Sequence, residues 1–166
     1  RAARHRVDRA DHLGQPVSAR IIQMTAADVA DWTRLRRALW PGTSRAEHEV
    51  DIAAALTQAG LNLIARGDDG RPLGFAEASM RHDYVNGTKT SPVAFLEGIY
   101  VEPSHRGRGI ARMLVISVEA WARQQGCSEL ASDTGIDNVV SQRMHEALGF
   151  SETQRVVFFR KVLKPE

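Results

Sequence analysis

Long apolar runs are absent from this chain of 166 residues, whose longest apolar stretches are only a few residues long. About 20 consecutive apolar residues are needed to cross a bilayer, so the sequence predicts no membrane span. The first residues also lack the pattern of a secretory leader, in which a basic segment precedes an apolar one. From these absences we expect a cytoplasmic protein.

Cysteine is scarce as well, because Cys127 is the only one in the sequence. A single cysteine cannot form a disulfide within the chain, and no group of Cys and His residues has zinc spacing. The sequence therefore predicts no metal site. Cys127 also has no base or cationic pattern beside it, which argues against a covalent acyl-cysteine route.

Charge is nearly balanced over the whole chain, with 22 Lys and Arg against 20 Asp and Glu, but it is distributed unevenly. Residues 1–20 contain five arginines and only two aspartates. An arginine-rich arm can bind nucleic acid, but this one has no lysine, aromatic residue or apolar period. We expect residues 1–20 to be a disordered leader or an added segment. Residues 21–166 are expected to form one domain, because the composition is that of a soluble globular chain.

The pattern of apolar residues and turn formers predicts the order of the elements. Strands are expected at residues 21–24, 61–66, 72–80, 93–101, 129–132 and 156–162, and helices at 29–39, 44–59, 110–125 and 138–148. Capping-box patterns open at Thr25 and Ser44. Strand, helix and strand in succession indicate a parallel pair, expected near the middle of a mixed sheet. The fold class is α/β, or α+β by some schemes.

The most informative segment joins the strand that ends at Val101 to the helix that begins at Ile110. It alternates arginine and glycine over residues 106–109. Glycines allow a tight turn with inward amides, a helix N-terminus adds partial positive charge, and guanidinium groups suit phosphate oxygens. The segment predicts a site for a di- or polyphosphate, and the alternative is a glycine turn with solvated arginines. Its full charges are those of Arg106, Arg108 and Arg112.

This segment resembles the acetyl-CoA loop of GCN5-related N-acetyltransferases. It reads Arg-Gly-Arg-Gly-Ile-Ala over residues 106–111, directly after a strand. A second stretch is similar to another motif of that superfamily, with Asn138, His145 seven residues later, and Ala-Leu-Gly-Phe at 147–150. The two motifs occur in the expected order, and the resemblance extends over about residues 21–163.

The resemblance implies a mixed central sheet flanked by helices, in which the strands at 93–101 and 128–133 splay apart to hold acetyl-CoA. It implies that the pantetheine arm pairs with the strand backbone. The cofactor-binding positions that it implies are Ile99, Tyr100, Val101, Gly107, Arg108, Gly109, Ile110, Ala111, Arg112 and Asn138, to which the charge of Arg106 adds.

Several blocks are also similar to the aminoglycoside 6′-N-acetyltransferases within that superfamily. They include Tyr-Val-Asn-Gly-Thr at 84–88, Phe-Leu-Glu-Gly-Ile-Tyr-Val at 95–101 and Ala-Ser-Asp at 131–133. The similarity implies acetyl transfer from acetyl-CoA to the 6′-amino group of an aminoglycoside, antibiotic resistance, and a homodimer. The substrate-binding residues that it implies are Trp40, Tyr84, Glu97 and Asp133.

Two positions depart from the group. Gln154 stands where many members have a glutamate, so we expect it to contact substrate with one acidic contact weakened or lost. His145 replaces the tyrosine that often serves as the acid in the superfamily. Because histidine titrates near neutral pH, we expect His145 to meet the CoA sulfur as a proton donor. The alternative is a surface histidine or one whose ring nitrogens have structural partners.

The two carboxylates are the remaining catalytic candidates. Glu97 interrupts an apolar strand, and alternation places it on the same face as Phe95, Ile99 and Val101. A charge there is costly unless it is used or paired, so the candidates are a base for the substrate ammonium and a salt bridge within the sheet. Asp133 follows a strand, where it either binds substrate or forms an Asx turn or helix cap.

Aromatic residues offer the last substrate contacts. Trp40 precedes a Pro-Gly break and Tyr84 lies in a polar loop, so both suit flat walls for a sugar ring, although both could be core residues. An acetyltransferase for another amine, such as a peptide N-terminus, a lysine or a polyamine, remains an alternative. A non-catalytic acyl-CoA sensor is a second alternative, which the two carboxylates argue against.

Overall fold

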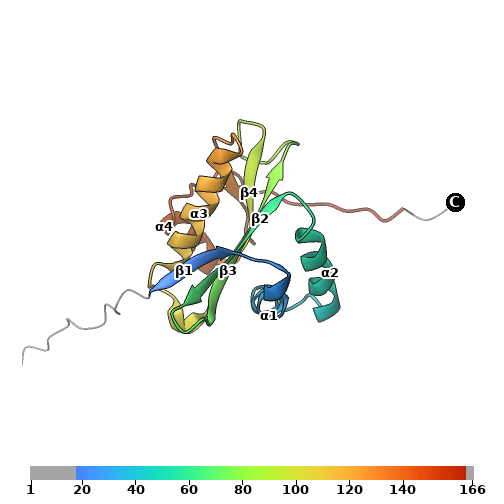
Figure 1. Ribbon diagram of the computed structural model, residues 1–166. Helices are drawn as coiled ribbons and strands as arrows, with labels where there is room; N and C mark the ends of the chain where they lie inside the picture. Colours follow the sequence, from blue (N-terminus) through green and yellow to red (C-terminus); the bar gives the residue numbers. More distant parts are fainter. Residues whose placement is uncertain (1–17, 164–166) are drawn as a thin grey trace, which may run out of the picture.

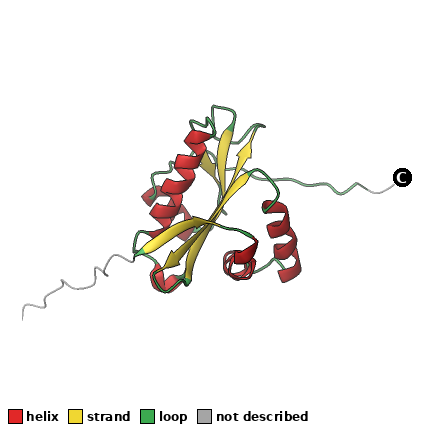
Figure 2. Cartoon of the chain, viewed as in Figure 1, coloured by secondary structure: helices red, strands yellow, loops and turns green. Residues whose placement is uncertain are grey.

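The computed structural model describes residues 18–163, and Figures 1 and 2 show a twisted sheet with helices on both faces. Its elements follow the chain in the order β1 (Ala19–Gln23), η1 (Ala26–Asp28), α1 (Val29–Leu39), α2 (Arg45–Ala55), β2 (Gly60–Gly67), β3 (Pro72–Arg81), β4 (Val93–Val101), η2 (Pro103–His105), α3 (Ile110–Gln124), β5 (Leu130–Ser132) and α4 (Val139–Ala147). The order agrees with the sequence prediction as far as α4. The leader expected at residues 1–20 lies outside the described residues up to residue 17, and Ala19 and Arg20 already belong to β1.

Within the described residues the strands form one five-stranded sheet in the order β1-β2-β3-β4-β5. Neighbouring strands are antiparallel from β1 to β4, whereas β4 and β5 are parallel. Helices α1 and α2 cover one face of the sheet, and α3 covers the other with α4 beside it (Figure 1). The mixed, helix-flanked sheet is therefore confirmed.

Local sequence signals account for the helix starts. Thr25 and Asp28 form a reciprocal capping box at η1, and Ser44 and Glu47 form another at α2. Helix α2 ends at Ala55, four residues before the expected end at Ala59. Its last carbonyls are taken by other donors, because the Asn62 side chain donates to the Ala55 oxygen at 3.3 Å.

Two hydrophobic clusters hold the layers together. Leu96 and Leu114 belong to the cluster between the sheet and α3. Trp32 and Phe75, both fully buried, belong to the cluster between the sheet and α1. Burial of a large apolar side chain contributes about 1.5–3 kcal/mol, so these clusters fix how both helices lie against the strands.

The predicted strand at residues 156–162 is wrong for the described chain. Residues 151–163 form no strand, and Figure 1 shows this segment leaving the body of the molecule. Phe158 is 84% exposed and Phe159 is 94% exposed. A β-forming sequence becomes a strand only where a neighbouring edge accepts its hydrogen bonds, and this segment lies beside none.

The parallel pair also lies elsewhere than expected. The sequence pattern places it near the middle of the sheet, but β5 is the last strand in the order, so the pair forms one edge. The pair lies at the edge because residues 156–162, which were expected to extend the sheet beyond β5, form no strand. The outer edge of β5 is consequently open among the described residues.

Candidate functional site

The gap between β4 and β5 is the central feature of the site. Residues 94–96 of β4 pair with 130–132 of β5, where β5 ends, but β4 continues to Val101. On its other side β4 remains paired with β3 up to Val101. The backbone of Ile99, Tyr100 and Val101 that faces away from β3 is therefore without a strand partner in the described chain. An extended ligand such as a pantetheine arm could pair with it.

A β-bulge lies at the point where the two strands separate. Glu77 of β3 is opposite Gly98 and Ala78 is opposite Leu96, so Glu97 is the extra residue. The bulge corrects the predicted face of Glu97. Phe95 packs against Val85, whereas Ile99 and Val101 pack in the cluster on the α3 face. The extra residue shifts the alternation, so Glu97 does not share a face with Ile99 and Val101.

Glu97 is held by two neighbours on β3. The Ser79 hydroxyl donates to Oε1 at 2.5 Å, and Arg81 donates to both carboxylate oxygens, at 3.0 and 2.9 Å. The Arg81 guanidinium also lies 3.4 Å from the centroid of the Phe95 ring. The sheet salt bridge is thus present. However, the Glu97 side chain remains 35% exposed, so a second cation can reach it.

Trp40 lies beside this carboxylate. A Cβ placed on Gly98, the residue after Glu97, would overlap the six-membered ring of the Trp40 indole. The lack of a side chain at Gly98 therefore lets Trp40 rest on β4 next to the bulge. Trp40 therefore lies against the residue next to Glu97, and its role in substrate binding stays a prediction.

A buried network of polar side chains packs against Trp40. Arg36 donates to Glu77 at 2.6 Å, to Asp51 at 2.8 Å and to Nδ1 of His48 at 3.3 Å. Its guanidinium lies 4.8 Å from the Trp40 ring centroid. Nε2 of His48 lies 3.3 Å from the Trp40 carbonyl. Because the Arg36 nitrogen can only donate, Nδ1 accepts, and Nε2 carries the hydrogen that reaches Trp40.

Glu77 is enclosed by this network and is buried. Trp32 donates its indole N–H to Glu77 at 2.5 Å, in addition to the bond from Arg36. Burial raises the pKa of the Glu77 carboxyl, and the nearby Arg36 charge acts in the opposite direction. Buried ion pairs contribute little net stability but hold a defined geometry, here that of the Trp40 support.

The loop at residues 82–91 is fixed at both ends. The Glu129 carboxylate accepts from the Lys89 and Thr90 amides at 2.9 and 2.8 Å and from the Thr90 hydroxyl at 2.5 Å. These bonds, the Thr90 hydroxyl first, lower the pKa of Glu129. Within the loop Val85 is buried whereas Tyr84 is 78% exposed. Tyr84 is therefore accessible to a ligand, but its position beside Glu97 stays a prediction.

The C-terminal segment passes this loop. Gly87 has a φ of +80°, and a Cβ there would overlap the Thr153 side chain. Gln154 follows Thr153 and is exposed, which places it near the loop that carries Tyr84. Asp133 comes directly after β5 and is exposed, with no hydrogen bond or ion pair among the described side chains. The Asx turn that the sequence left open is therefore not formed.

The glycine-arginine loop has the expected backbone. Gly107 and Gly109 have φ values of +72° and +84°, and a Cβ at either would meet open space. Gly109 is the N-cap of α3, so the first amides of that helix have no partner within it. The helix end thus presents free N–H groups and a partial positive charge, which suits an anion.

Three polar residues around the loop have structural partners as well. Arg106 donates to the Val101 carbonyl at 2.9 Å, and Arg112 donates to the Ala147 carbonyl at the end of α4, at 3.0 Å. Asn138 caps α4 by accepting from the Ser141 amide at 3.1 Å. These contacts orient the loop and α4. They leave other donors of Arg106, Arg112 and Asn138 for a ligand.

His145 lies on α4 and faces the end of β5. Its Nε2 is 2.9 Å from the Ser132 hydroxyl, and its Nδ1 is 2.8 Å from the Ser141 carbonyl. His145 is partly buried and both of its ring nitrogens have partners, so it is a satisfied residue rather than a surface one, and its role as a proton donor stays a prediction. Cys127 is buried and contacts the Met80 sulfur at 3.6 Å, a packing role.

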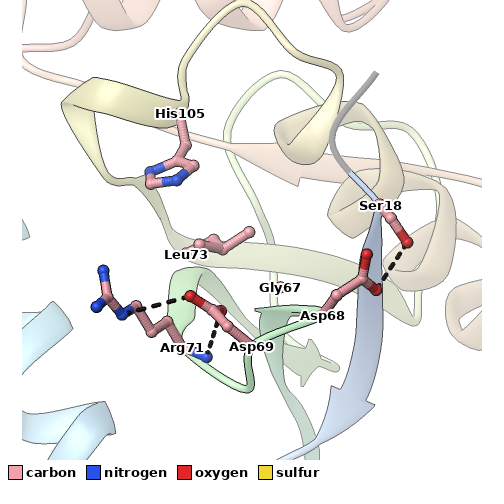
Figure 3. A pocket seen from close by; sticks show the side chains of 7 residues that line it. All are labelled: Ser18, Gly67, Asp68, Asp69, Arg71, Leu73 and His105. Carbon is pink, nitrogen blue, oxygen red and sulfur yellow. Dashed lines mark hydrogen bonds and ion pairs between the residues drawn. The ribbon is translucent and has the colours of Figure 1, made fainter. Parts of the chain in front are cut away.

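A separate hollow of about 310 Å³ lies at the turn between β2 and β3 (Figure 3). It is lined by Ser18, Gly67, Asp68, Asp69, Arg71, Leu73 and His105. Its carboxylates already have partners, since the Ser18 hydroxyl donates to Asp68 at 2.9 Å and Arg71 pairs with Asp69 at 3.4 Å. It contains none of the predicted site residues. In the part of the chain described, no group of acidic, His and Cys side chains is arranged to hold a metal, and no helix is long and apolar enough to cross a membrane.

Sequence reasoning missed the partners of the site residues. Arg81 and Ser79 were not expected at Glu97, nor Ser132 at His145, nor Arg36 and His48 beneath Trp40. The two polar neighbours on β3, Ser79 and Arg81, alternate with the apolar Ala78 and Met80, a pattern that places them on one face. The bonds themselves depend on strand register and helix packing, which no local pattern contains.

Comparison with known proteins agrees with this geometry. The model of the acetyltransferase (GNAT) family matches residues 28–150, which include the bulge, the glycine-arginine loop and His145. The chain belongs to the GNAT family. The matched range contains both the open β4 edge and the glycine-arginine loop at the start of α3.

Relatives within the family share one activity in their names. An aminoglycoside N(6′)-acetyltransferase type 1 from Serratia marcescens is 53% identical over 133 residues, which cover 80% of this chain and 91% of that protein. The apo aminoglycoside 6′-N-acetyltransferase from Acinetobacter haemolyticus has a TM-score of 0.85 at 46% identity, covering 87% of this chain and 99% of that one. The enzyme AAC(6′)-Iy in complex with the bisubstrate analogue CoA-S-monomethyl-acetylneamine has a TM-score of 0.83 at 47% identity, covering 88% and 99%.

Proposed function

We propose that this GNAT protein transfers an acetyl group from acetyl-CoA to the 6′-amino group of aminoglycoside antibiotics. The observation that carries the proposal is the position of an accessible carboxylate, Glu97, at the point where β4 and β5 separate. An acyl donor lying in the gap and a cationic acceptor at Glu97 would meet there. Relatives 48–53% identical to the chain are aminoglycoside 6′-acetyltransferases, which supports the acceptor.

The cofactor side uses the backbone of the chain. The free amides of α3 and the adjoining loop hold the pyrophosphate, and Asn138 contacts the donor from α4. The residues of this pyrophosphate site are Arg106, Gly107, Arg108, Gly109, Ile110, Ala111 and Arg112. Ile99, Tyr100 and Val101 pair with the pantetheine arm. This arrangement places the thioester beside Glu97 without a metal.

The acceptor side uses charge and a flat wall. Glu97 binds the ammonium of the substrate and removes a proton from it, directly or through water, after the ammonium has replaced Arg81 at the carboxylate. Trp40 covers one face of the amino sugar, and Tyr84 and Gln154 border it from the loop and the C-terminal segment. Asp133 binds a second ammonium. Holding donor and acceptor in line lowers the barrier by several kcal/mol.

The best alternative is acetylation of another amine, such as a peptide N-terminus, a lysine or a polyamine. A polyamine would also use carboxylates, but a flexible chain gains little from a rigid indole wall. The fixed position of the Trp40 indole therefore favours an acceptor that contains a sugar ring. A non-catalytic acyl-CoA sensor would not need an exposed carboxylate at the thioester position.

We also infer that the protein is a homodimer in the cytoplasm, where acetyl-CoA is available. Support for the dimer comes from the exposed apolar residues of the C-terminal segment, which are Val156, Val157, Phe158, Phe159, Val162 and Leu163. The open outer edge of β5 offers backbone groups to such a segment from a second copy. Exposed strand edges and apolar patches of this kind are commonly covered by a partner.

A panel of acceptors tests the proposed activity. Release of CoA thiol is measured with aminoglycosides that carry a 6′-amino group, with analogues that carry a 6′-hydroxyl group, and with a peptide and a polyamine. We expect release only with the 6′-amino compounds, and an added acetyl group by mass spectrometry. Preference for the peptide or the polyamine over every aminoglycoside would contradict the substrate assignment.

A further inference from the structure

The Ser132 hydroxyl joins two elements at the place where β4 and β5 diverge. It lies 3.1 Å from the Leu96 carbonyl of β4 and 2.9 Å from Nε2 of His145 on α4. Leu96 and Ser132 are the last residues paired between the two strands. Leu96 also directly precedes Glu97, so the hydroxyl lies one residue from the bulge.

Glu97 and His145 lie on opposite faces of the sheet, because the Phe150 ring that contacts His145 packs in the cluster on the α3 face. Leu96 packs in the cluster on the α3 face, and the neighbouring Glu97 lies with Ser79 and Arg81 on the other face. A thioester in the gap would therefore have Glu97 on one face and the pair of Ser132 and His145 on the other. This is the placement that a base and an acid need.

The hydrogen bonds are complete in one protonation state only. The Ser141 carbonyl accepts from Nδ1, so a neutral ring has no hydrogen on Nε2. The Ser132 hydroxyl can then donate its one hydrogen either to Nε2 or to the Leu96 carbonyl, so only one of these two hydrogen bonds can form. In the imidazolium form Nε2–H donates to Ser132, and Ser132 donates to Leu96. The ring has no hydrogen bond to a charged group; its other contacts are the Ser141 hydroxyl at 3.4 Å and the Phe150 ring at 5.2 Å.

We propose that Ser132 and His145 form a proton relay that delivers a proton to the sulfur of the departing CoA. The proposal rests on the acetyltransferase function proposed above. As the amine nitrogen bonds to the acetyl carbon and the carbon–sulfur bond breaks, the sulfur takes the Ser132 hydrogen. Ser132 takes the hydrogen of Nε2, and His145 becomes neutral. The proton lost by the amine leaves through Glu97 or water, and His145 regains one from solvent.

Three variants and their double mutant test the relay. Ser132→Ala and His145→Gln are each expected to lower kcat about 10- to 100-fold, with KM for both substrates within about threefold of wild type. The double variant is expected to be no slower than the slower single one, because both residues act in one step. Ser132→Thr keeps the hydroxyl and is expected to retain kcat within about threefold.

A spectroscopic readout separates the relay from the substrate assignment. Imidazole ¹⁵N NMR of the free protein is expected to show the hydrogen of neutral His145 on Nδ1, and Ser132→Ala is expected to shift the Nε2 resonance selectively. A folded Ser132→Ala protein with wild-type kcat, or independent effects that multiply in the double variant, would overturn the relay. Failure of the aminoglycoside panel would overturn the substrate instead, and the NMR result would stand apart from it.

Discussion

At the scale of single residues, each candidate carboxylate has different surroundings. Glu97 is paired with Arg81 and Ser79, whereas Asp133 is exposed and has no side-chain partner among the described residues. Under the proposed function, a substrate ammonium would displace a guanidinium at Glu97 but would meet an unpaired carboxylate at Asp133. The two positions should respond differently to loss of charge.

Asp133→Asn is expected to raise the KM for aminoglycosides roughly 10- to 150-fold, because a charge-assisted hydrogen bond contributes ~1.5–3 kcal/mol. Glu97→Gln is expected to lower kcat as well, since it removes the base. Steady-state kinetics with both substrates measure these effects, and the KM for acetyl-CoA should change less than a few-fold in either variant. An unchanged kcat/KM in Asp133→Asn would exclude its role in substrate binding.

Gly109 is the residue on which the phosphate site depends most directly. Gly109→Asp is expected to raise the Kd of CoA at least about tenfold, because the side chain blocks approach to the helix amides and repels phosphate. Isothermal titration measures the Kd. Gly70→Asp is the matched control, since Gly70 also has a left-handed φ, +77°, and open space around it, but lies in the β2–β3 turn. If a folded Gly109→Asp protein binds CoA as tightly as wild type, the loop is not part of the CoA site.

At the scale of elements, one carboxylate attaches the 82–91 loop to the residues before β5. The Glu129 carboxylate accepts hydrogen bonds from Lys89 and Thr90 of that loop. The loop in turn carries Tyr84 and contacts Thr153 through Gly87. Movement of the loop would therefore alter several acceptor contacts together.

The lowered pKa of Glu129 makes this attachment dependent on pH. Its ordinary value is 4.5, and the folded protein lowers it, so the stabilisation is complete above about pH 4.5 and is lost as the pH falls through the lowered pKa. Thermal unfolding should show Glu129→Gln less stable than wild type at neutral pH, with the difference shrinking below pH 4.5. Thr90→Val, which removes one donor, should show a smaller effect of the same sign. A difference that does not change with pH would contradict the assignment.

At the scale of the whole molecule, the C-terminal segment is the part that the single chain leaves unpacked. Its side chains are exposed to an extent unusual for phenylalanine, and Figure 1 shows the segment extending away from the helices and the sheet. The same residues have the composition of a strand. A second copy would offer its own open β5 edge to this segment.

Phe158→Asp combined with Phe159→Asp is expected to convert a dimer into a monomer of 18.3 kDa, because the charges prevent burial of the segment. Light scattering coupled to size exclusion measures the mass. Lys161→Gln, in the same segment, is the control and should leave the dimer intact. A wild-type mass of one chain at working concentration would refute the dimer.

Local chemistry in the sequence determined most of the elements of this protein. Several features depend only on neighbours in the chain, so they could be predicted without the fold. They are the capping boxes at Thr25 and Ser44, the Gly-Arg turn before α3, and the apolar periods of α1 and α3. The glycine-arginine loop and the second motif also indicated the acetyl-CoA side. These features are local because a turn or cap is satisfied within a few residues.

Only the tertiary structure decided how the reacting groups meet. The register between strands decides the bulge that changes the face of Glu97 and the bonds that Glu97 receives from Arg81 and Ser79. The packing of α4 decides the contact of Ser132 with His145. Residues 156–162 have strand chemistry but form no strand, because an edge is required and none lies beside them. Hydrogen bonding across strands is a property of two segments at once, and a sequence pattern describes each segment alone.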